Sequence, residues 1–123
     1  MAEAAGGFYT LARWQVRPGN EEAFREAWHA MGDAFAVAVP DARSEGTLIQ
    51  SLTEPTTFYS FGPWESLQQI ERVRADPAAQ EKMKAAMALC TEATPGAYRI
   101  VGRVVAEGDR WSSGRYRQES GQL

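Results

Sequence analysis

A chain of 123 residues with 44% hydrophobic content is long enough for one domain with its own core and too short for two ordinary ones. Its net charge of −3 and its scattered Lys and Arg residues give no electrostatic footprint for nucleic acid or an anionic membrane, so neither is an expected partner. One histidine and one cysteine nearly exclude a His/Cys metal site, and every apolar run is shorter than the roughly 20 residues of a membrane span.

The start of the chain carries neither the basic region nor the apolar run of a secretory signal. The single Cys90 cannot form an internal disulfide, which agrees with a reducing compartment. We therefore expect a cytoplasmic protein.

Alternating side chains over residues 8–17 predict a first strand, with large groups on both faces. Pro18 and Gly19 then turn the chain, and Asn20 is the expected N-cap of a helix that Pro40 ends. The apolar stripe of this helix should bury against a sheet; it consists of Phe24, Trp28, Met31 and Phe35. His29 lies one step off the stripe, either at the surface or reaching a site.

A second strand is predicted over residues 43–53, followed by a short turn and a third strand from residue 57 that breaks at Gly62 and Pro63. Trp64 stands at the junction with the next helix, at the mouth of the space between sheet and helix. That helix covers about residues 66–74, with Ser66 and Gln69 in a capping pattern.

Asp76 and Pro77 predict the start of a further helix that continues to about residue 92. Its methionine-rich stripe either belongs to the core or lines a ligand space. A turn at residues 94–96 leads to a last strand over residues 97–105. We interpret residues 1–107 as one domain with its core in 8–105, and residues 108–123 as a polar tail that is disordered or leans on a neighbour through Trp111 and Tyr116.

The element order predicts an α+β fold: the ferredoxin-like βαββαβ antiparallel sheet with helices on one face. The other face would expose Tyr9, Leu11, Tyr59 and Phe61, an apolar area too large to leave in water, so we expect a homodimer. On that face Arg13 and Arg17 should lie beside Arg99 and Arg103, since the first and last strands pair.

Four motifs carry a resemblance to a known family. They are V-x-P-G-x-E-x-x-F from Val16, F-Y-x-F-x-x-W-E-S from Phe58, D-P before the second long helix, and P-G-x-Y opening the last strand. Over about residues 8–105 the chain resembles the antibiotic biosynthesis monooxygenase domain, of the dimeric α+β barrel superfamily. The resemblance implies a pocket between sheet and helices, and either cofactor-free oxygenation of polyketide anthrones or haem degradation.

Carried over residue by residue, the tryptophan common to both activities is Trp64. The asparagine, tyrosine and arginine of the anthrone oxygenases correspond to Ser60, Ile70 and the vicinity of Met83 between Lys82 and Lys84. The haem-degrading members require a strand asparagine, here Ala12, and a helix histidine that this chain lacks, so we expect neither haem nor another cofactor.

We therefore predict a cofactor-independent monooxygenase that oxidises a small aromatic or polyketide-like substrate with O₂. Trp64, with its indole N–H free or bonded only to water, and Ser60 would be catalytic, and the substrate-binding wall would comprise Trp14, Phe24, Trp28, Ile70 and Met83. In the alternative interpretation these tryptophans only fill the core, and the chain is a non-catalytic dimeric barrel that binds an apolar molecule or serves as an assembly module.

Overall fold

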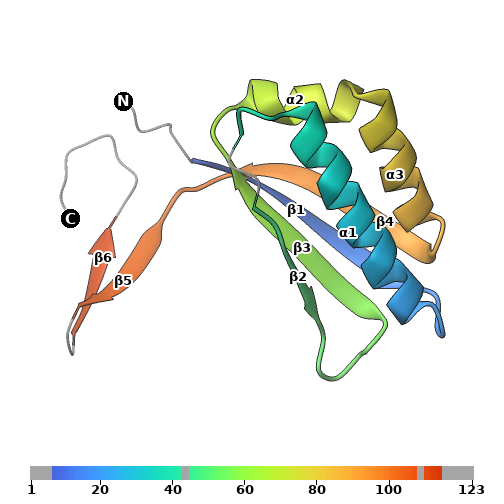
Figure 1. The fold of residues 1–123 in the computed structure, drawn as a ribbon. Coiled ribbons are helices and arrows are strands. Elements are labelled where there is room, and N and C mark those ends of the chain that lie inside the picture. Colours follow the sequence, from blue (N-terminus) through green and yellow to red (C-terminus); the bar gives the residue numbers. More distant parts are fainter. Residues whose placement is uncertain (1–6, 43–44, 108–109, 115–123) are drawn as a thin grey trace.

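The computed structural model describes residues 7–42, 45–107 and 110–114. The elements are β1 (Phe8–Val16), α1 (Glu21–Ala38), β2 (Thr47–Gln50), β3 (Thr57–Trp64), α2 (Leu67–Ala75), α3 (Pro77–Met87), β4 (Cys90–Arg99), β5 (Arg103–Glu107) and β6 (Arg110–Gly114). Strands β2, β3, β1 and β4 form one antiparallel sheet in that order, and the helices cover one of its faces (Figure 1). The predicted ferredoxin-like fold is confirmed.

Every second side chain along β1 and β3 faces the helices, and these side chains form the core. Trp14, Val16 and Phe58 are buried there, and Phe24 of α1 is completely buried between Trp14 and Phe58, with ring centroids 5.1 Å from each. The predicted stripe of α1 therefore packs as expected. These aromatic rings pack α1 against one end of the sheet. The other end of the same sheet face remains available for a cavity.

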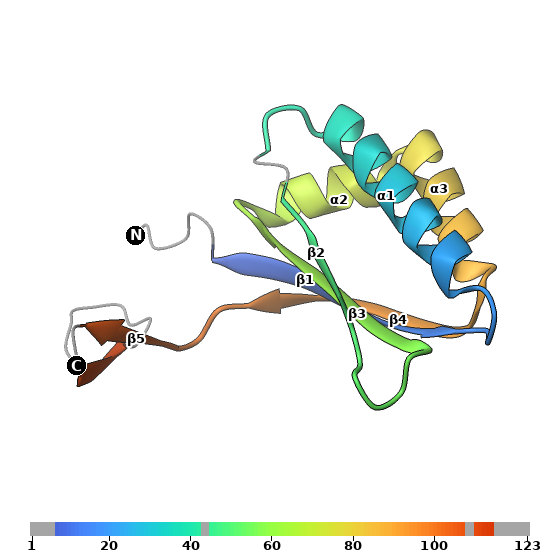
Figure 2. The same cartoon turned by 60° about the horizontal axis from the view of Figure 1, so that its bottom comes forward.

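Two helix starts follow the predicted chemistry. The side chain of Ser66 accepts a hydrogen bond from the Gln69 backbone N–H at 3.2 Å, and Asp76 caps α3 in the same way with Pro77 at its first position. Asn20 precedes α1 without a side-chain capping bond. The bend between α2 and α3 is therefore encoded by Asp76 and Pro77 (Figures 1 and 2).

The boundaries of the last strand were predicted wrongly. Helix α3 ends at Met87, and β4 begins at Cys90, so Pro95 and Gly96 lie within the strand. β4 is an edge strand, where a proline, which has no backbone N–H, is tolerated. The ring of Tyr98 lies over Gly96, so a side chain at this position would collide with it. The third strand likewise continues through Gly62 and Pro63 to Trp64.

This earlier start of β4 also changes the predicted register. Arg13 lies opposite Thr94 and Phe8 opposite Arg99, while Arg103 belongs to β5 in a different sheet. The expected cluster of four arginines is therefore not formed. Arg13 instead pairs with Glu92, its Nη1 lying 3.8 Å from Oε1.

After β4 the chain leaves the sheet and forms a two-stranded arm, β5 and β6, which stands apart from the body of the domain (Figures 1 and 2). Trp111, predicted to lie in an aperiodic tail, is in β6 opposite Ala106. Tyr116 lies outside the described residues. Within the described part of the chain, no helix is long and apolar enough to cross a membrane.

Candidate active site

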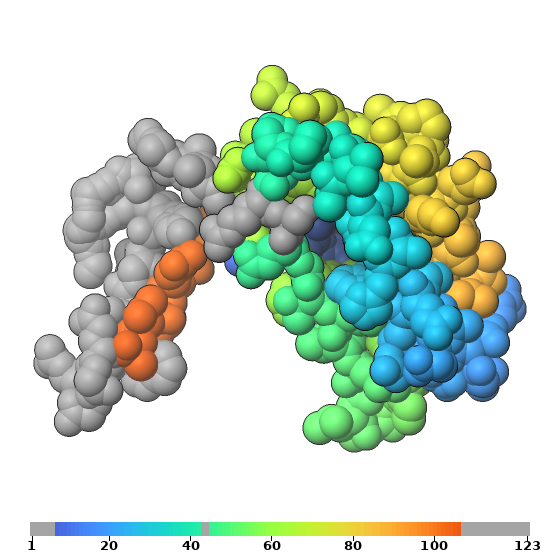
Figure 3. All heavy atoms as spheres, viewed as in Figure 1, coloured from blue at the N-terminus to red at the C-terminus, as the bar shows by residue number. Residues whose placement is uncertain are grey.

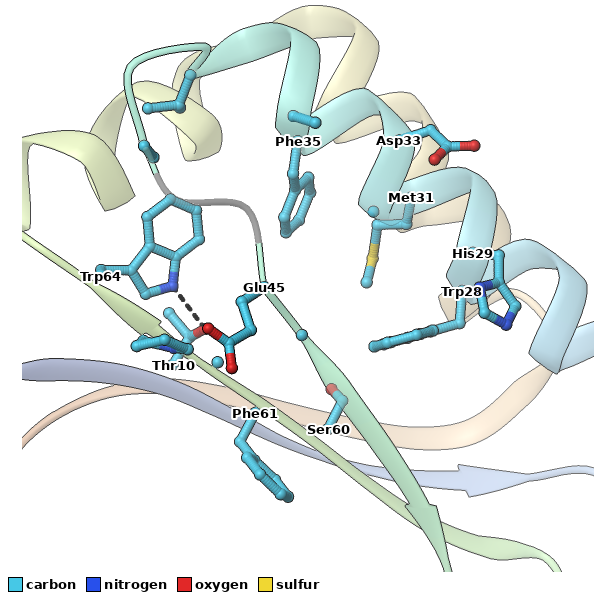
Figure 4. A pocket seen from close by; sticks show the side chains of 17 residues that line it. Thr10, Trp28, His29, Met31, Asp33, Phe35, Glu45, Ser60, Phe61 and Trp64 are labelled. Carbon is cyan, nitrogen blue, oxygen red and sulfur yellow. Dashed lines mark hydrogen bonds between the residues drawn. The ribbon is translucent and has the colours of Figure 1, made fainter. Parts of the chain in front are cut away.

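A cavity of about 320 Å³ lies between α1 and the helix-facing side of β1 and β3. Figure 3 shows the surface hollowed between α1 and the start of β2, and Figure 4 shows the side chains that line the cavity. Its lining comprises Thr10, Trp28, His29, Met31, Gly32, Asp33, Phe35, Ala36, Val39, Ala42, Glu45, Gly46, Ser60, Phe61, Gly62, Pro63 and Trp64. Its volume is at the lower end of the range typical of small-molecule sites.

Glycines let the chain pass close to the sheet on one side of this cavity. The carbonyl oxygen of Glu45 sits where a Cβ on Gly62 would be, and the aromatic ring of Trp28 lies 3.7 Å from where a Cβ on Gly46 would be. Gly62 is opposite Thr10 in the β1–β3 register. Glu45 therefore lies over the part of the sheet that carries Thr10 (Figure 4).

The indole N–H of Trp64 was predicted to be free or water-bonded, and this prediction is wrong. Nε1 of Trp64 donates a hydrogen bond to Oγ1 of Thr10, with an N–O distance of 2.9 Å (Figure 4). Trp64 is opposite Phe8 in the register, so Thr10 is its diagonal neighbour on the same face of the sheet. Trp64 is nevertheless only partly buried and lines the cavity with its ring.

Trp14 and Ser60 form a second pair of the same kind, with the tryptophan on β1 and the hydroxyl on β3. Nε1 of Trp14 donates to Oγ of Ser60 at 2.9 Å, and both residues are buried, at 3% and 7% exposure. Each strand thus presents a hydroxyl and a tryptophan four residues apart, and the antiparallel register joins each tryptophan to the hydroxyl of the other strand.

With these two bonds in place, the hydroxyl groups of Thr10 and Ser60 can still donate hydrogen bonds at the cavity wall. An indole N–H can only donate, so the Thr10 and Ser60 oxygens must be the acceptors, and each hydroxyl keeps its own hydrogen. Two O–H donors on neighbouring strands can therefore bind one negatively charged oxygen of a ligand.

A second, smaller cavity of about 80 Å³ adjoins the first. The two cavities share a wall, which consists of Thr10, Met31, Phe35, Ser60 and Trp64. The remaining lining of the smaller cavity is largely apolar and comes from α2, α3, β1 and β4.

The predicted site residues divide between these spaces. Trp64 and Ser60 line both cavities, and Trp28 lines the larger one. Trp14, Ile70 and Met83 line only the smaller cavity. Phe24 lines neither of the two, since it is completely buried in the core between sheet and helix.

Sequence reasoning missed Thr10, Glu45 and Gly62. The signal for Thr10 was the repeated spacing, with Thr10 and Trp14 on β1 matching Ser60 and Trp64 on β3. Glu45 carried no local signal, because its place depends on how the chain crosses Gly62. His29 is exposed, with its ring 5.3 Å from that of Trp28 and at the mouth of the larger cavity.

Hydrogen bonds and an ion pair at Asp41 hold the segment after α1 against α2. Asp41 accepts two hydrogen bonds from Nη2 of Arg72, at 2.7 and 2.9 Å, and a longer one from the side chain of Gln69. The hydrogen bond from Arg72 is the main reason that the pKa of Asp41 lies below its usual range. The Asp41–Arg72 ion pair lies next to Ala42, which is part of the cavity wall.

We expect Asp41→Asn to lower the thermal midpoint slightly at pH 7 and not at all near pH 2. The carboxylate has a lower pKa in the folded chain than in the unfolded one, so its stabilisation is complete above the usual pKa and disappears as the pH falls through the folded value. Both side chains are more than half exposed, so solvent screens the effect. Calorimetry of both proteins across this range tests it; a difference that grows on acidification would contradict it.

Comparison with known proteins matches the chain to one family model. A family model described as antibiotic biosynthesis monooxygenase matches residues 7–85, more than half of the chain. No curated protein matches the chain.

Solved structures resemble the fold at low sequence identity. An asparagine-to-alanine mutant of SnoaB, a cofactor-independent oxygenase from Streptomyces nogalater, matches with a TM-score of 0.69 and 20% identity, over 78% of this chain and 94% of that one. A putative antibiotic biosynthesis monooxygenase from Bordetella bronchiseptica matches at 0.66 and 19%, over 78% and 98%. Another from Caulobacter crescentus CB15 matches at 0.66 and 15%, over 80% and 92%. At these identities the likeness establishes the fold alone.

Proposed function

The chain belongs to the antibiotic biosynthesis monooxygenase family, and from this membership we propose that it is a cofactor-independent monooxygenase. Its substrate is a small aromatic or polyketide-like molecule, which is oxidised by O₂ in the larger cavity. SnoaB, whose fold is similar, is described as a cofactor-independent oxygenase. The observation that carries the proposal is the pair of hydroxyl donors, Thr10 and Ser60, on the wall of that cavity.

Such a reaction requires an electron-rich substrate that loses a proton and then gives electrons to O₂. The resulting anion must be stabilised, and two fixed O–H donors in a site shielded from water do this well. The indole N–H groups of Trp14 and Trp64 hold the hydroxyl oxygens in place, so the donors need little reorganisation when the anion forms. In this proposal the tryptophans position the donors, and the hydroxyls touch the substrate.

Glu45 is our candidate for the base that removes the proton. It lines the larger cavity, and its backbone lies directly over Gly62, opposite Thr10. A carboxylate there could accept a proton from an acidic C–H or O–H while the substrate oxygen faces the hydroxyls. General-base catalysis typically contributes about 10²–10⁴-fold to a rate.

The test uses anthrone as the probe. Oxidation of its methylene by one O₂ gives anthraquinone and one water, so the four electrons lost by carbon reduce the dioxygen completely and no further reductant is required. Wild-type protein should raise O₂ uptake and anthraquinone formation above the spontaneous rate, and Glu45→Gln should lower kcat by about 10²-fold or more. Asp33→Asn, at the mouth of the same cavity, is the matched control. Equal rates with and without protein, for anthrone and a naphthohydroquinone, would contradict the proposal.

The alternative function is a non-catalytic barrel that binds an apolar molecule, and one observation favours it. The indole N–H groups of Trp14 and Trp64 are already bonded within the protein, so neither of these two can bond a substrate directly. A binder should show saturable quenching of tryptophan fluorescence by anthrone under argon, without catalysed oxidation in air. An oxygenase should show both.

We further propose that the chain works as a homodimer formed through the open face of the sheet. Tyr59 is 37% exposed and Tyr98 is 54% exposed on this face, beside the partly buried Tyr9, Leu11 and Phe61. A partner covering them would stabilise the pair, since burying one such side chain contributes about 1.5–3 kcal/mol.

Light scattering at micromolar concentration should give twice the monomer mass. Tyr59→Lys should shift the protein toward the monomer, because it places a charge within the apolar face. Glu54→Lys, in the exposed β2–β3 turn, is the control and should remain a dimer. A monomeric wild-type protein would refute this arrangement.

We also infer a reducing, cytoplasmic setting. Cys90 is a free buried thiol, and burial raises its pKa, so the sulfur stays protonated and unreactive.

A further inference from the structure

The two cavities meet at Thr10, Ser60 and Trp64 and open at different ends. The larger one opens between α1 and the start of β2, where its exposed lining includes Asp33 and Glu45. The smaller one opens between α2, α3 and β4, where the exposed lining residues are Arg74, Met87 and Pro95. A ligand bound at the two hydroxyls can therefore extend toward either mouth.

The charges at the two mouths differ in sign. The carboxylates of Asp33 and Glu45 lie at the larger mouth. Among the described residues that line the smaller cavity, Arg74 is the only charged one. Between Arg74 and the hydroxyls the lining is mostly apolar and includes Ile70 and Val73, each 3% exposed. A charge beside such a lining acts more strongly than it would in water, so the smaller mouth favours an anionic group.

The guanidinium of Arg74 is available to a ligand. Arg72, two residues earlier on α2, is bonded to Asp41, whereas the side chain of Arg74 has no hydrogen bond or ion pair within the described part of the chain. Its backbone carbonyl accepts a hydrogen bond from the side chain of Gln80, which holds the end of α2 at the bend before α3. A guanidinium binds a carboxylate through two parallel hydrogen bonds, and here it can do so without breaking an existing contact.

We propose, on the basis of the oxygenase function above, that the substrate is an aromatic acid and that Arg74 binds its carboxylate. The reacting ring lies in the larger cavity with its oxygen at Thr10 and Ser60, and a short acidic substituent crosses the smaller cavity to Arg74. The opposite orientation would bring the carboxylate to Asp33 and Glu45, where like charges repel. Arg74 therefore both selects the substrate and directs its reacting ring toward Glu45.

Binding of an unreactive ligand tests this without turnover. The probe is anthraquinone-2-propanoate, which O₂ does not oxidise, and its methyl ester is the uncharged comparison. At low ionic strength the wild-type protein should bind the acid about tenfold more tightly than the ester, measured by tryptophan fluorescence. The preference should shrink in high salt, because Arg74 is exposed. Equal affinity for acid and ester would overturn the proposal.

Two variants with the same loss of charge locate the effect. Arg74→Gln should weaken binding of the acid by about tenfold and change binding of the ester by less than about twofold. Lys82→Gln is the matched control, since Lys82 is exposed on α3 and lines neither cavity, and it should leave the affinity for the acid within about twofold. If Lys82→Gln weakens the acid as much, or if Arg74→Gln weakens acid and ester alike, Arg74 does not hold the carboxylate.

The corresponding anthrone acid separates this inference from the proposed function. One O₂ oxidises its methylene to the quinone and gives one water, as for anthrone itself, so no reductant is required. Arg74→Gln should raise KM for this acid by about tenfold and leave kcat within about twofold. A preference for the acid in binding, without catalysed oxidation, would leave the role of Arg74 standing and overturn the oxygenase assignment. Catalysed oxidation with equal binding of acid and ester would do the opposite.

Discussion

Replacing Ser60 with Ala is expected to lower kcat by about 10²-fold and to destabilise the fold by about 1–3 kcal/mol. The loss in rate follows from removing one of two donors to the substrate anion. The loss in stability has a separate cause: the indole N–H of Trp14 is buried at 3% exposure, and without Ser60 it has no partner in the described structure. Steady-state kinetics and chemical denaturation measure the two effects independently.

Thr10→Val provides the informative comparison. It removes the other donor while keeping the side-chain shape, so it should lower kcat by a similar factor. Trp64, however, is only partly buried, and its N–H can turn to water, so stability should change by less than about 1 kcal/mol. Thr53→Val in the exposed β2–β3 turn should change neither quantity much. If Ser60→Ala and Thr10→Val both leave turnover intact, the hydroxyls do not hold the substrate.

Local signals in the sequence were sufficient for most of the fold. Ser66, Asp76 and Pro77 mark helix starts through contacts within four residues, and the stripe on α1 follows directly from the helical period. Pro95 and Gly96 misled the prediction, because the same residues that make turns are also tolerated on an edge strand. Edge position depends on strand order, which no local signal contains.

The site was less predictable, since its key contacts join distant segments. The bonds from Trp14 to Ser60 and from Trp64 to Thr10 span 46 and 54 residues. They exist because β1 and β3 pair in one particular register. A shift of one strand by one residue would place the tryptophan and the hydroxyl of each bond on opposite faces of the sheet. The sequence therefore predicted which residues face the helices and missed what their polar atoms bond.

Gly62→Ala is the second substitution with a large expected effect. A methyl group at position 62 would overlap the carbonyl oxygen of Glu45, a backbone atom that cannot rotate away as a side chain would. The chain around Glu45 and Gly46 must then lift from the sheet, which we expect to cost about 1–3 kcal/mol, as overpacking of a buried position typically does. The same movement would open the larger cavity and displace Glu45 from its place over Thr10.

Gly32→Ala is the matched control for this prediction. Gly32 lines the same cavity from α1, but a Cβ there meets no atom within 4 Å. Alanine in a helix is favoured over glycine, so this variant should be more stable by about 0.5–1 kcal/mol and should bind anthrone as the wild type does. Gly62→Ala should instead weaken anthrone binding by about tenfold, measured by tryptophan fluorescence under argon. Similar affinity in both variants would mean that the crossing of the chain over Gly62 does not shape the substrate cavity.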